Sequence, residues 1–339
     1  MWVLLVALFL ATDTIATPLC SADPPSKANG LPQCIWYNSS LGFGARLQAL
    51  MSELTPAEKL SVLNQQTVDR LVVPKDSFNE ALHGIAWSGR ATVFPCPMML
   101  GATFNEKLVR KIGGVVGIEA LAKHWGRDHS NGLSFFAPNI NIVRDVRWGR
   151  AQETYGEDPT LTGKLGAAYV QGMQYLGSTN TSSPLAVRNV AKHFAAYNLE
   201  SDFAGRTAPS EIAKGVGQYR LQYDAPVSKA DLLQTFLPAF EAVVGKAKIR
   251  GIMCAYNSVN GVPLCANDLL EEQLRQRLGF DGFVITDCGA IGFMTSNHHW
   301  SRANGTAYSA VEATAASVNA GTDLCCGSAF SNHLTDSVL

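Results

Sequence analysis

The sequence of 339 residues is poor in charge and has no excess of either sign. Only 16% of the residues are charged, and 27 basic residues stand against 28 acidic ones, which gives a formal net charge of -1. Such a chain has no basic surface field that would attract a phosphate backbone or an anionic lipid, so we expect no nucleic-acid partner. Because 47% of the residues are hydrophobic, the composition excludes a disordered chain and allows a large core.

No apolar run at the amino terminus is long enough to span a bilayer, which takes about 20 residues. The run from Val3 to Leu10 suits the core of a signal peptide, with Thr14 to Ala16 as a small-residue cleavage site. No lysine or arginine precedes this run, which departs from the signal-peptide pattern and leaves a buried first strand or helix as the alternative. We expect residues 1–19 to be a signal peptide with a short leader, and no membrane association after its cleavage.

Spacings typical of structural zinc sites are also missing. No two of the eight cysteines form a CxxC pair, and the adjacent Cys325 and Cys326 are poorly placed to share a metal, so we expect neither a metal nor a cofactor. An even number of cysteines permits disulfides in an oxidising compartment without fixing their pairing. Sequons for N-glycosylation begin at Asn38, Asn180 and Asn304. These features predict a secreted or extracellular protein.

Hydrophobic periodicity predicts helices first and then an alternation of strands and helices. Residues 44–65 show two short helical patterns, the second with Thr55 as N-cap, Pro56 at the first helical position and Glu58 completing a capping box. Further on, the expected strands are 134–142, 186–190, 249–255 and 283–286, and the expected helices are 105–123, 161–176, 229–244 and 268–278.

This alternation predicts parallel βα units and therefore an α/β fold. The number of repeats favours a (β/α)8 TIM-like barrel, not necessarily regular or complete, over residues 20–339. Residues 199–218 are expected to form the longest loop. The glycine-rich run 113–117 lies inside a helical pattern, so it is not a dinucleotide-binding fingerprint.

Polar residues cluster where the expected strands end, which in a barrel is the face that carries active sites. The run Phe283–Thr286 carries Asp287 to its tip, followed by Cys288 and Gly289. Such a carboxylate is well placed for chemistry, although an aspartate in this position can also serve only as a helix cap.

Two further stretches carry candidate binding groups. Lys192 and His193 follow an apolar run and could donate hydrogen bonds to hydroxyl groups, although a lone Lys–His pair is often only a solvated loop. The stretch from residue 138 to residue 159 is rich in arginine and carboxylates. We expect Arg144, Asp145 and Glu153 to hold this loop together, which leaves Arg150 as the ligand contact.

Five ordered segments together form a specific pattern: WGR at 148–150, QETYGEDP at 152–159, KHF at 192–194, CAYNSVNGVP at 254–263 and ITD at 285–287. In this order they closely resemble the first domain of glycoside hydrolase family 3, notably its β-xylosidase branch. The resemblance extends from about Leu47 to Gly327. It implies a secreted retaining exo-β-glycosidase that hydrolyses β-xylosides or xylo-oligosaccharides through a covalent glycosyl-aspartate.

The resemblance also implies roles for individual residues. Asp287 matches the family's nucleophile, and the sugar-binding positions match Glu80, Arg150, Lys192, His193 and Tyr256. Arg220 aligns with a further arginine contact, with Arg206 as a rival because the loop here is longer.

Cysteines complete this comparison. Cys254 and Cys265 resemble a family disulfide, and Cys288 resembles a half-cystine that joins a cysteine of the TDLCCG segment, which we take to be Cys326.

The family's glucosidases usually carry tryptophan after the nucleophile and aspartate at the position of Glu80. The residues found here follow the xylosidase pattern, although one methylene discriminates between sugars by only about 1–3 kcal/mol.

Retaining hydrolysis needs a second carboxyl group as general acid/base. In this family it normally lies on a second α/β domain that follows the barrel. We expect this sequence to be either a fragment of a longer enzyme or a short form without its proton donor, and loss of the proton donor would lower the rate by about 10²- to 10⁴-fold. The alternatives are a weak or non-catalytic sugar-binding barrel, β-glucosidase or α-L-arabinofuranosidase specificity within the family, and a barrel that uses Lys192 as a Schiff base.

Overall fold

The computed structural model describes residues 34–126, 132–200 and 220–338. The chain divides into two compact units, Met1–Asp76 and Ser77–Leu339. The expected signal peptide and its cleavage site lie outside the described residues, as does most of the expected loop 199–218.

The described part of the first unit is a small helical body. Its elements are a 3-10 turn Ile35–Tyr37, α1 (Phe43–Glu53), α2 (Pro56–Leu63) and a 3-10 turn Asp69–Leu71. Thr55 and Glu58 form the predicted capping box at the start of α2. Trp36, Leu54 and Leu71 are buried together in its core. This region carries none of the candidate site residues and acts as scaffold.

The second unit is built on a parallel sheet of five strands in the order β1-β2-β3-β5-β8. The strands are β1 (Phe78–Glu80), β2 (Ser134–Phe136), β3 (Arg188–Phe194), β5 (Gly251–Cys254) and β8 (Phe283–Thr286). A second, three-stranded sheet has the order β4-β6-β7, with β4 (Asp224–Ala225), β6 (Ser258–Val259) and β7 (Val262–Pro263). The predicted α/β class is confirmed, and parallel strands joined by helices are what the alternating pattern requires.

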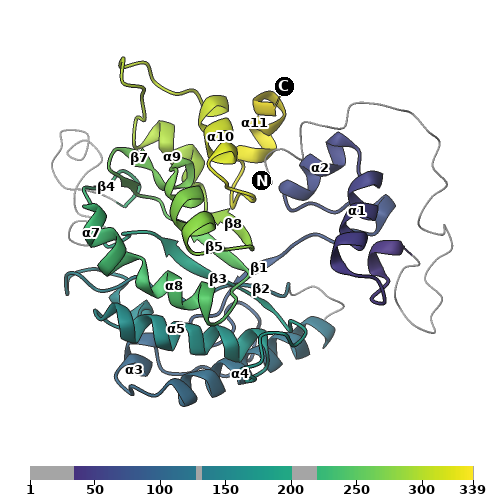
Figure 1. Ribbon diagram of the computed structural model, residues 1–339, viewed down its shortest axis with the longest axis vertical. Helices are drawn as coiled ribbons and strands as arrows, with labels where there is room; N and C mark the ends of the chain where they lie inside the picture. The colour runs from purple at the N-terminus through teal and green to yellow at the C-terminus, as the bar shows by residue number, and fades with distance from the viewer. Residues whose placement is uncertain (1–33, 127–131, 201–219, 339) are drawn as a thin grey trace. The chain divides into compact units, whose positions relative to one another are not determined.

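Helices connect these strands and surround the sheet (Figure 1). They are α3 (Pro97–Gly101), α4 (Glu106–Gly126), α5 (Pro159–Gln174), α7 (Lys229–Asp231), α8 (Pro238–Gly245), α9 (Ala290–Ser296), α10 (Ala310–Asn319) and α11 (Ala329–Val338). Shorter turns are the 3-10 helices Ala151–Glu153 and Leu264–Ala266 and the π-helical segments Leu232–Phe236 and Leu270–Arg277. None of the described helices is both long and apolar enough to cross a membrane.

Glycines explain how closely α4 and α5 pack. A Cβ on Gly113 would lie 2.5 Å from the Tyr169 carbonyl oxygen, and one on Gly117 would lie 2.6 Å from the Met173 carbonyl oxygen. Because no larger residue fits these positions, the glycine-rich run serves helix packing, in agreement with its predicted place inside a helix.

Three expected elements differ from the observed ones. The expected strand 134–142 ends at Phe136, because Pro138 has no N–H to donate to a ladder. The expected helix 229–244 is broken before Pro238 into α7, a π-helical segment and α8. The expected strand 186–190 is β3, which continues to Phe194 and so contains Lys192 and His193.

Candidate active site

The predicted site residues meet at the carboxyl edge of the parallel sheet. Glu80 is the last residue of β1, His193 is the second-last residue of β3, and Asp287 follows β8 directly. Tyr256 lies two residues beyond the end of β5. Because parallel strands present their carboxyl ends on one side, residues far apart in sequence converge there.

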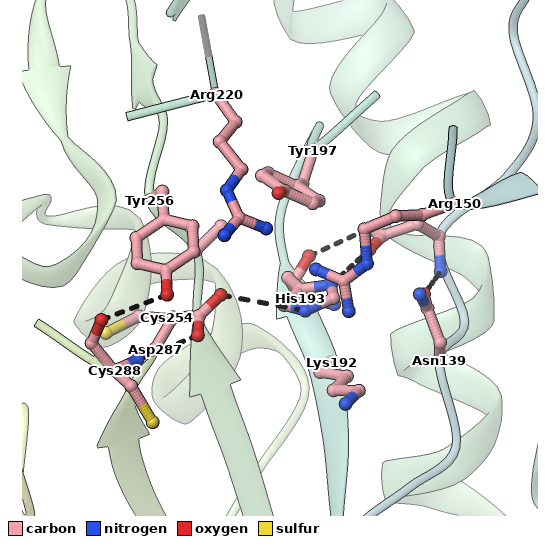
Figure 2. Close-up of polar contacts among 12 residues, drawn as sticks. Asn139, Arg150, Lys192, His193, Tyr197, Arg220, Cys254, Tyr256, Asp287 and Cys288 are labelled. Atoms are coloured by element: carbon pink, nitrogen blue, oxygen red, sulfur yellow. Dashed lines mark hydrogen bonds and ion pairs between the residues drawn. The ribbon is translucent and has the colours of Figure 1, made fainter. Parts of the chain in front are cut away.

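Asp287 is a buried carboxylate with one engaged and one unengaged oxygen. Its Oδ1 accepts a hydrogen bond from the Cys288 N–H at 2.7 Å. Its Oδ2 lies 3.7 Å from His193 Nε2 (Figure 2) and has no hydrogen-bond partner in the part of the chain that the structure describes. Burial raises the pKa of Asp287, and the Cys288 N–H, the cations of Arg150 and Lys192 and the nearby Tyr256 hydroxyl oppose this shift. The Tyr256 hydroxyl hydrogen itself is donated to the Cys288 carbonyl.

The alternative reading of Asp287 as a helix cap does not hold. The N-cap of α9 is Gly289, whose φ of 85° is in the left-handed region, and no side chain caps this helix. Because the backbone turns sharply at Gly289, the Asp287 side chain does not cap α9 and lies beside His193 instead.

Lys192, which is buried, and Glu80, which is part-buried, form an ion pair. Lys192 Nζ donates to both carboxylate oxygens of Glu80, at 2.6 and 2.7 Å. Burial raises the pKa of Glu80, and the Lys192 ammonium opposes this shift. Lys192 is 2% exposed, so it is not part of a solvated loop. An ammonium held by two carboxylate oxygens is a poor amine nucleophile, which argues against the Schiff-base alternative.

His193 is held by an asparagine that the sequence pattern did not single out. Asn141 Oδ1 accepts from the His193 backbone N–H and contacts ring Nδ1, both at 2.9 Å, and Asn141 Nδ2 donates to the His193 carbonyl at 2.8 Å. Burial, followed by the nearby cations of Arg150, Lys192 and Arg220, holds the pKa of His193 well below its usual range. The ring is therefore neutral at neutral pH.

Arg150 lies beside this histidine in a second ion pair. Its Nε and one terminal nitrogen donate to the two oxygens of Glu153, each at 2.8 Å, and its guanidinium lies 5.6 Å from the centre of the Tyr197 ring. Although burial opposes the charged form, Glu153 raises the pKa of Arg150. Glu153 thus holds the loop as predicted, and it also fixes Arg150. Asp145 pairs with the exposed Arg147 within the same loop.

Arg220 makes the third ion pair. It donates to Glu200 at 2.6 Å, and its guanidinium lies 5.1 Å from the centre of the Tyr256 ring. The Tyr256 hydroxyl donates to the Cys288 carbonyl at 2.9 Å. Arg206, the alternative to Arg220 for this arginine contact, lies outside the described residues.

A pocket of about 380 Å³ opens beside these groups. Its lining includes the polar residues Glu80, Arg150, Glu153 and Lys192 and the exposed Trp87. This volume and this mixture of an aromatic surface with a few convergent polar groups are typical of small-molecule sites.

Two disulfides brace the surroundings of Asp287. Cys254 pairs with Cys265, and Cys288 pairs with Cys326, as the family resemblance implied. The Cys288–Cys326 bond links the residue that follows Asp287 to the segment that follows α10. Together they hold the residues around the carboxylate in one arrangement.

Asn141, Tyr197 and Glu200 were not predicted from the sequence. Asn141 had a signal, because asparagine at positions 139 and 141 alternates with isoleucine in an apolar run, and buried polar residues often have specific partners. Tyr197 and Glu200 had none, since they lie in an ordinary loop sequence after β3 and their roles come from contacts with Arg150 and Arg220.

The arrangement places one unengaged carboxylate oxygen among three ion-paired cations and a neutral histidine. Glu80, Arg150, Glu153 and Lys192 line the pocket, and Asp287 and His193 lie beside them without lining it. Carboxylates, cations and an imidazole that lie this close together suit a ligand with many hydroxyl groups, because each hydroxyl both donates and accepts. The fold and this site define a parallel α/β protein whose ligand site lies at the carboxyl ends of its strands.

Comparison with known proteins identifies the family. Residues 51–330 match the glycosyl hydrolase family 3 N-terminal domain, so the chain belongs to this family, whose N-terminal domain has a TIM-like (β/α)8 fold.

The relatives and solved structures agree with this assignment. The chain is 37% identical to the probable beta-D-xylosidase 7 of Arabidopsis thaliana over 97% of this chain and 42% of that protein. It is 35% identical to the beta-xylosidase/alpha-L-arabinofuranosidase 2 of Medicago sativa subsp. varia, over 97% of this chain and 41% of that protein. A solved family 3 exo-β-xylosidase in complex with a xylobiose aziridine activity-based probe superimposes with a TM-score of 0.76 and 33% identity, covering 89% of this chain and 38% of that one. The chain thus spans less than half the length of these relatives.

Proposed function

We propose that this chain is the nucleophile-bearing, sugar-binding part of a retaining exo-β-glycosidase that acts on β-xylosides. In this proposal Asp287 attacks the anomeric carbon and displaces the leaving-group oxygen, which gives a covalent glycosyl-aspartate that water then hydrolyses. Lys192, His193, Arg150 and Glu80 bind the hydroxyl groups of the sugar.

The observation that carries the proposal is the state of Asp287 Oδ2. A nucleophilic carboxylate needs an oxygen that is not held by other donors, and this oxygen has no hydrogen-bond partner among the described residues. The other site carboxylates, Glu80, Glu153 and Glu200, are each paired with a cation at 2.6–2.8 Å. Only Asp287 thus combines a position beside the sugar-binding groups with an available oxygen.

Xylose is the proposed sugar for two reasons. The relatives named above are called β-xylosidases, and the superimposed exo-β-xylosidase structure carries a xylobiose-derived probe. In addition, Glu80 reaches into the pocket one methylene further than an aspartate would. In this proposal the longer side chain occupies space that the hydroxymethyl group of glucose would need.

The proton donor for the leaving group is proposed to lie outside the described residues. The carboxylates of Glu80, Glu153 and Glu200 are each held by a cation at 2.6–2.8 Å, so none of them presents a free carboxyl group to the leaving-group oxygen. A further α/β domain of the kind found in this family would supply the missing carboxyl group.

Secretion is part of the same proposal. The asparagines of all three sequons, Asn38, Asn180 and Asn304, are exposed, so they are open to glycosylation. Two disulfides in the second unit also suit an oxidising compartment. Expression with the native amino terminus in a secreting host should release a glycosylated chain that begins near residue 17. Retention of an unprocessed chain inside the cell would contradict this part.

The experiment is covalent labelling of the purified chain with a xylobiose aziridine probe or a dinitrophenyl β-xyloside, whose leaving group needs little protonation. We expect one sugar adduct per chain, which peptide mass spectrometry assigns to the segment containing Asp287. Asp287→Asn should abolish the adduct, and the matched surface variant Asp281→Asn should keep it, since the Asp281 side chain is 76% exposed.

The aryl β-glucoside and the aryl α-L-arabinofuranoside serve as competing substrates. Faster labelling by either of them would replace xylose as the proposed sugar. Binding of xylose without any adduct would support a non-catalytic sugar-binding domain, and an adduct on Lys192 after borohydride reduction would support a Schiff-base enzyme.

A further inference from the structure

The contacts between Asn141 and His193 fix more than the position of the histidine. The amide of Asn141 is oriented by the backbone of residue 193, because its oxygen accepts from that N–H at 2.9 Å and its nitrogen donates to that carbonyl at 2.8 Å. The orientation of this amide is therefore not ambiguous, as it often is when only side chains surround it.

With the amide oriented in this way, the same Oδ1 faces ring Nδ1 at 2.9 Å. An amide oxygen can only accept, so Nδ1 must carry the hydrogen. In a neutral imidazole the other nitrogen, Nε2, then has a lone pair and no hydrogen. Nε2 is the nitrogen that faces Asp287 Oδ2 at 3.7 Å.

Two acceptors therefore converge without a hydrogen between them. The distance of 3.7 Å is longer than a hydrogen bond, and Oδ2 has no other hydrogen-bond partner among the described residues. The charged groups around the ring are Arg150, Lys192, Arg220 and Asp287. The ring itself is 1% exposed, and three cations nearby disfavour a fourth.

We propose that Asn141 is a positioning residue that holds His193 as the Nδ1–H tautomer, so that Nε2 accepts a hydrogen bond from a hydroxyl of the bound sugar. The inference rests on the proposed function for the identity of the ligand. The hydrogen bond between His193 and the sugar then has the opposite direction to the one expected from the sequence, in which Lys192 and His193 both donate to hydroxyl groups. It also keeps the histidine from forming an ion pair with Asp287, which leaves that carboxylate free to attack.

The test is nitrogen-15 NMR of the full chain labelled on histidine, at pH 7. Two-bond proton–nitrogen correlations separate the Nδ1–H tautomer, the Nε2–H tautomer and the imidazolium. The variant His193→Gln identifies the signal among the seven histidines of the chain. We expect the Nδ1–H pattern for His193, with a shift of the Nε2 signal when xylose is added.

Variants separate the role of Asn141 from a general effect on packing. Asn141→Leu removes the acceptor, so the ring should change to Nε2–H or imidazolium and the affinity for xylose should fall by about tenfold or more. Asn141→Asp keeps an acceptor and should keep hydrogen on Nδ1. The matched control Asn189→Leu changes another fully buried asparagine, which donates to the Ala137 carbonyl, and should leave the His193 pattern unchanged.

The outcomes distinguish this inference from the proposed function. Nε2–H or imidazolium in the unmodified chain would overturn the inference, even if xylose binds. The Nδ1–H pattern with no response to xylose would uphold the role of Asn141 in fixing the tautomer, while rejecting the hydroxyl contact and the proposed sugar. If Asn141→Leu does not fold, the spectrum of the unmodified chain and that of Asn141→Asp still decide.

Discussion

Replacing Asp287 by asparagine should make the protein more stable while it removes labelling by the sugar probe. The carboxylate is 8% exposed and Oδ2 has no hydrogen-bond partner among the described residues, so the folded protein keeps a charge in a place where water no longer solvates it. Asparagine has nearly the same shape and can still accept from the Cys288 N–H. Its amide nitrogen would replace Oδ2, 3.7 Å from His193 Nε2, and could donate to it.

The magnitude follows from the cost of a buried polar group without a partner, which is about 1–3 kcal/mol. For a domain of this size each kcal/mol corresponds to a rise in Tm of about 2 °C. The stability gained by Asp287→Asn should also depend on pH. Burial raises the pKa of Asp287 in the folded state, so the folded form binds the proton more tightly than the unfolded chain, whose aspartates titrate near pH 3.9.

The contribution of the neutral Asp287 carboxyl group to the free energy of unfolding is therefore fully present at pH values below the pKa that Asp287 has in the unfolded chain. This contribution is lost as the pH rises through the pKa that Asp287 has in the folded protein. The Asp287→Asn variant carries no such penalty, so its advantage should be largest at pH 7–8 and should shrink towards pH 4. Thermal unfolding of both proteins across this range measures it. Asp281→Asn, at an exposed position, should change the stability by less than about 0.5 kcal/mol. A variant that is less stable at pH 7, or an advantage that grows towards acid, would refute the reasoning.

Other perturbations test the rest of the site and its support. Lys192→Met should cost about 1–3 kcal/mol in urea unfolding because it leaves the part-buried Glu80 carboxylate without its cation, and the double variant with Glu80→Gln should recover much of this loss; a double-variant loss equal to the sum of the two single losses would show that the pair is not coupled. Replacing Cys254 and Cys265 by serine should cost about 3 kcal/mol in chemical denaturation, since the bond closes a loop with a sequence separation of 11, and an unchanged midpoint would mean that the bond does not form. Gly172→Ala should cost about 1–3 kcal/mol because its Cβ would enter the backbone of α4, whereas a change below about 0.5 kcal/mol would show that the two helices can separate.

Much of the fold could be predicted from local pattern. The capping box of Thr55 and Glu58, the helix over the glycine-rich run 113–117 and the strand that ends before Asp287 all depend on residues within a few positions of one another. Local pattern was less accurate where proline intervened, as at Pro138 and Pro238.

The ordered motifs were also enough to place Asp287, Lys192 and His193 in one site, because parallel strands bring their carboxyl ends to the same edge. The motifs did not show how two neighbours on one strand could both serve that site. In a regular strand they would point to opposite faces, but the register of β3 against β5 is irregular between Ala191 and Phe194, and an irregularity of this kind redirects side chains.

What the sequence by itself determined was the family, the α/β class and the carboxylate at the end of β8. Only the tertiary structure decided the state of each site group. Glu80 pairs with Lys192 across 112 residues, and Asn141 holds His193 across 52. Hydrogen bonds and burial between segments this far apart set the charge and the tautomer of each group, and no local periodicity contains them.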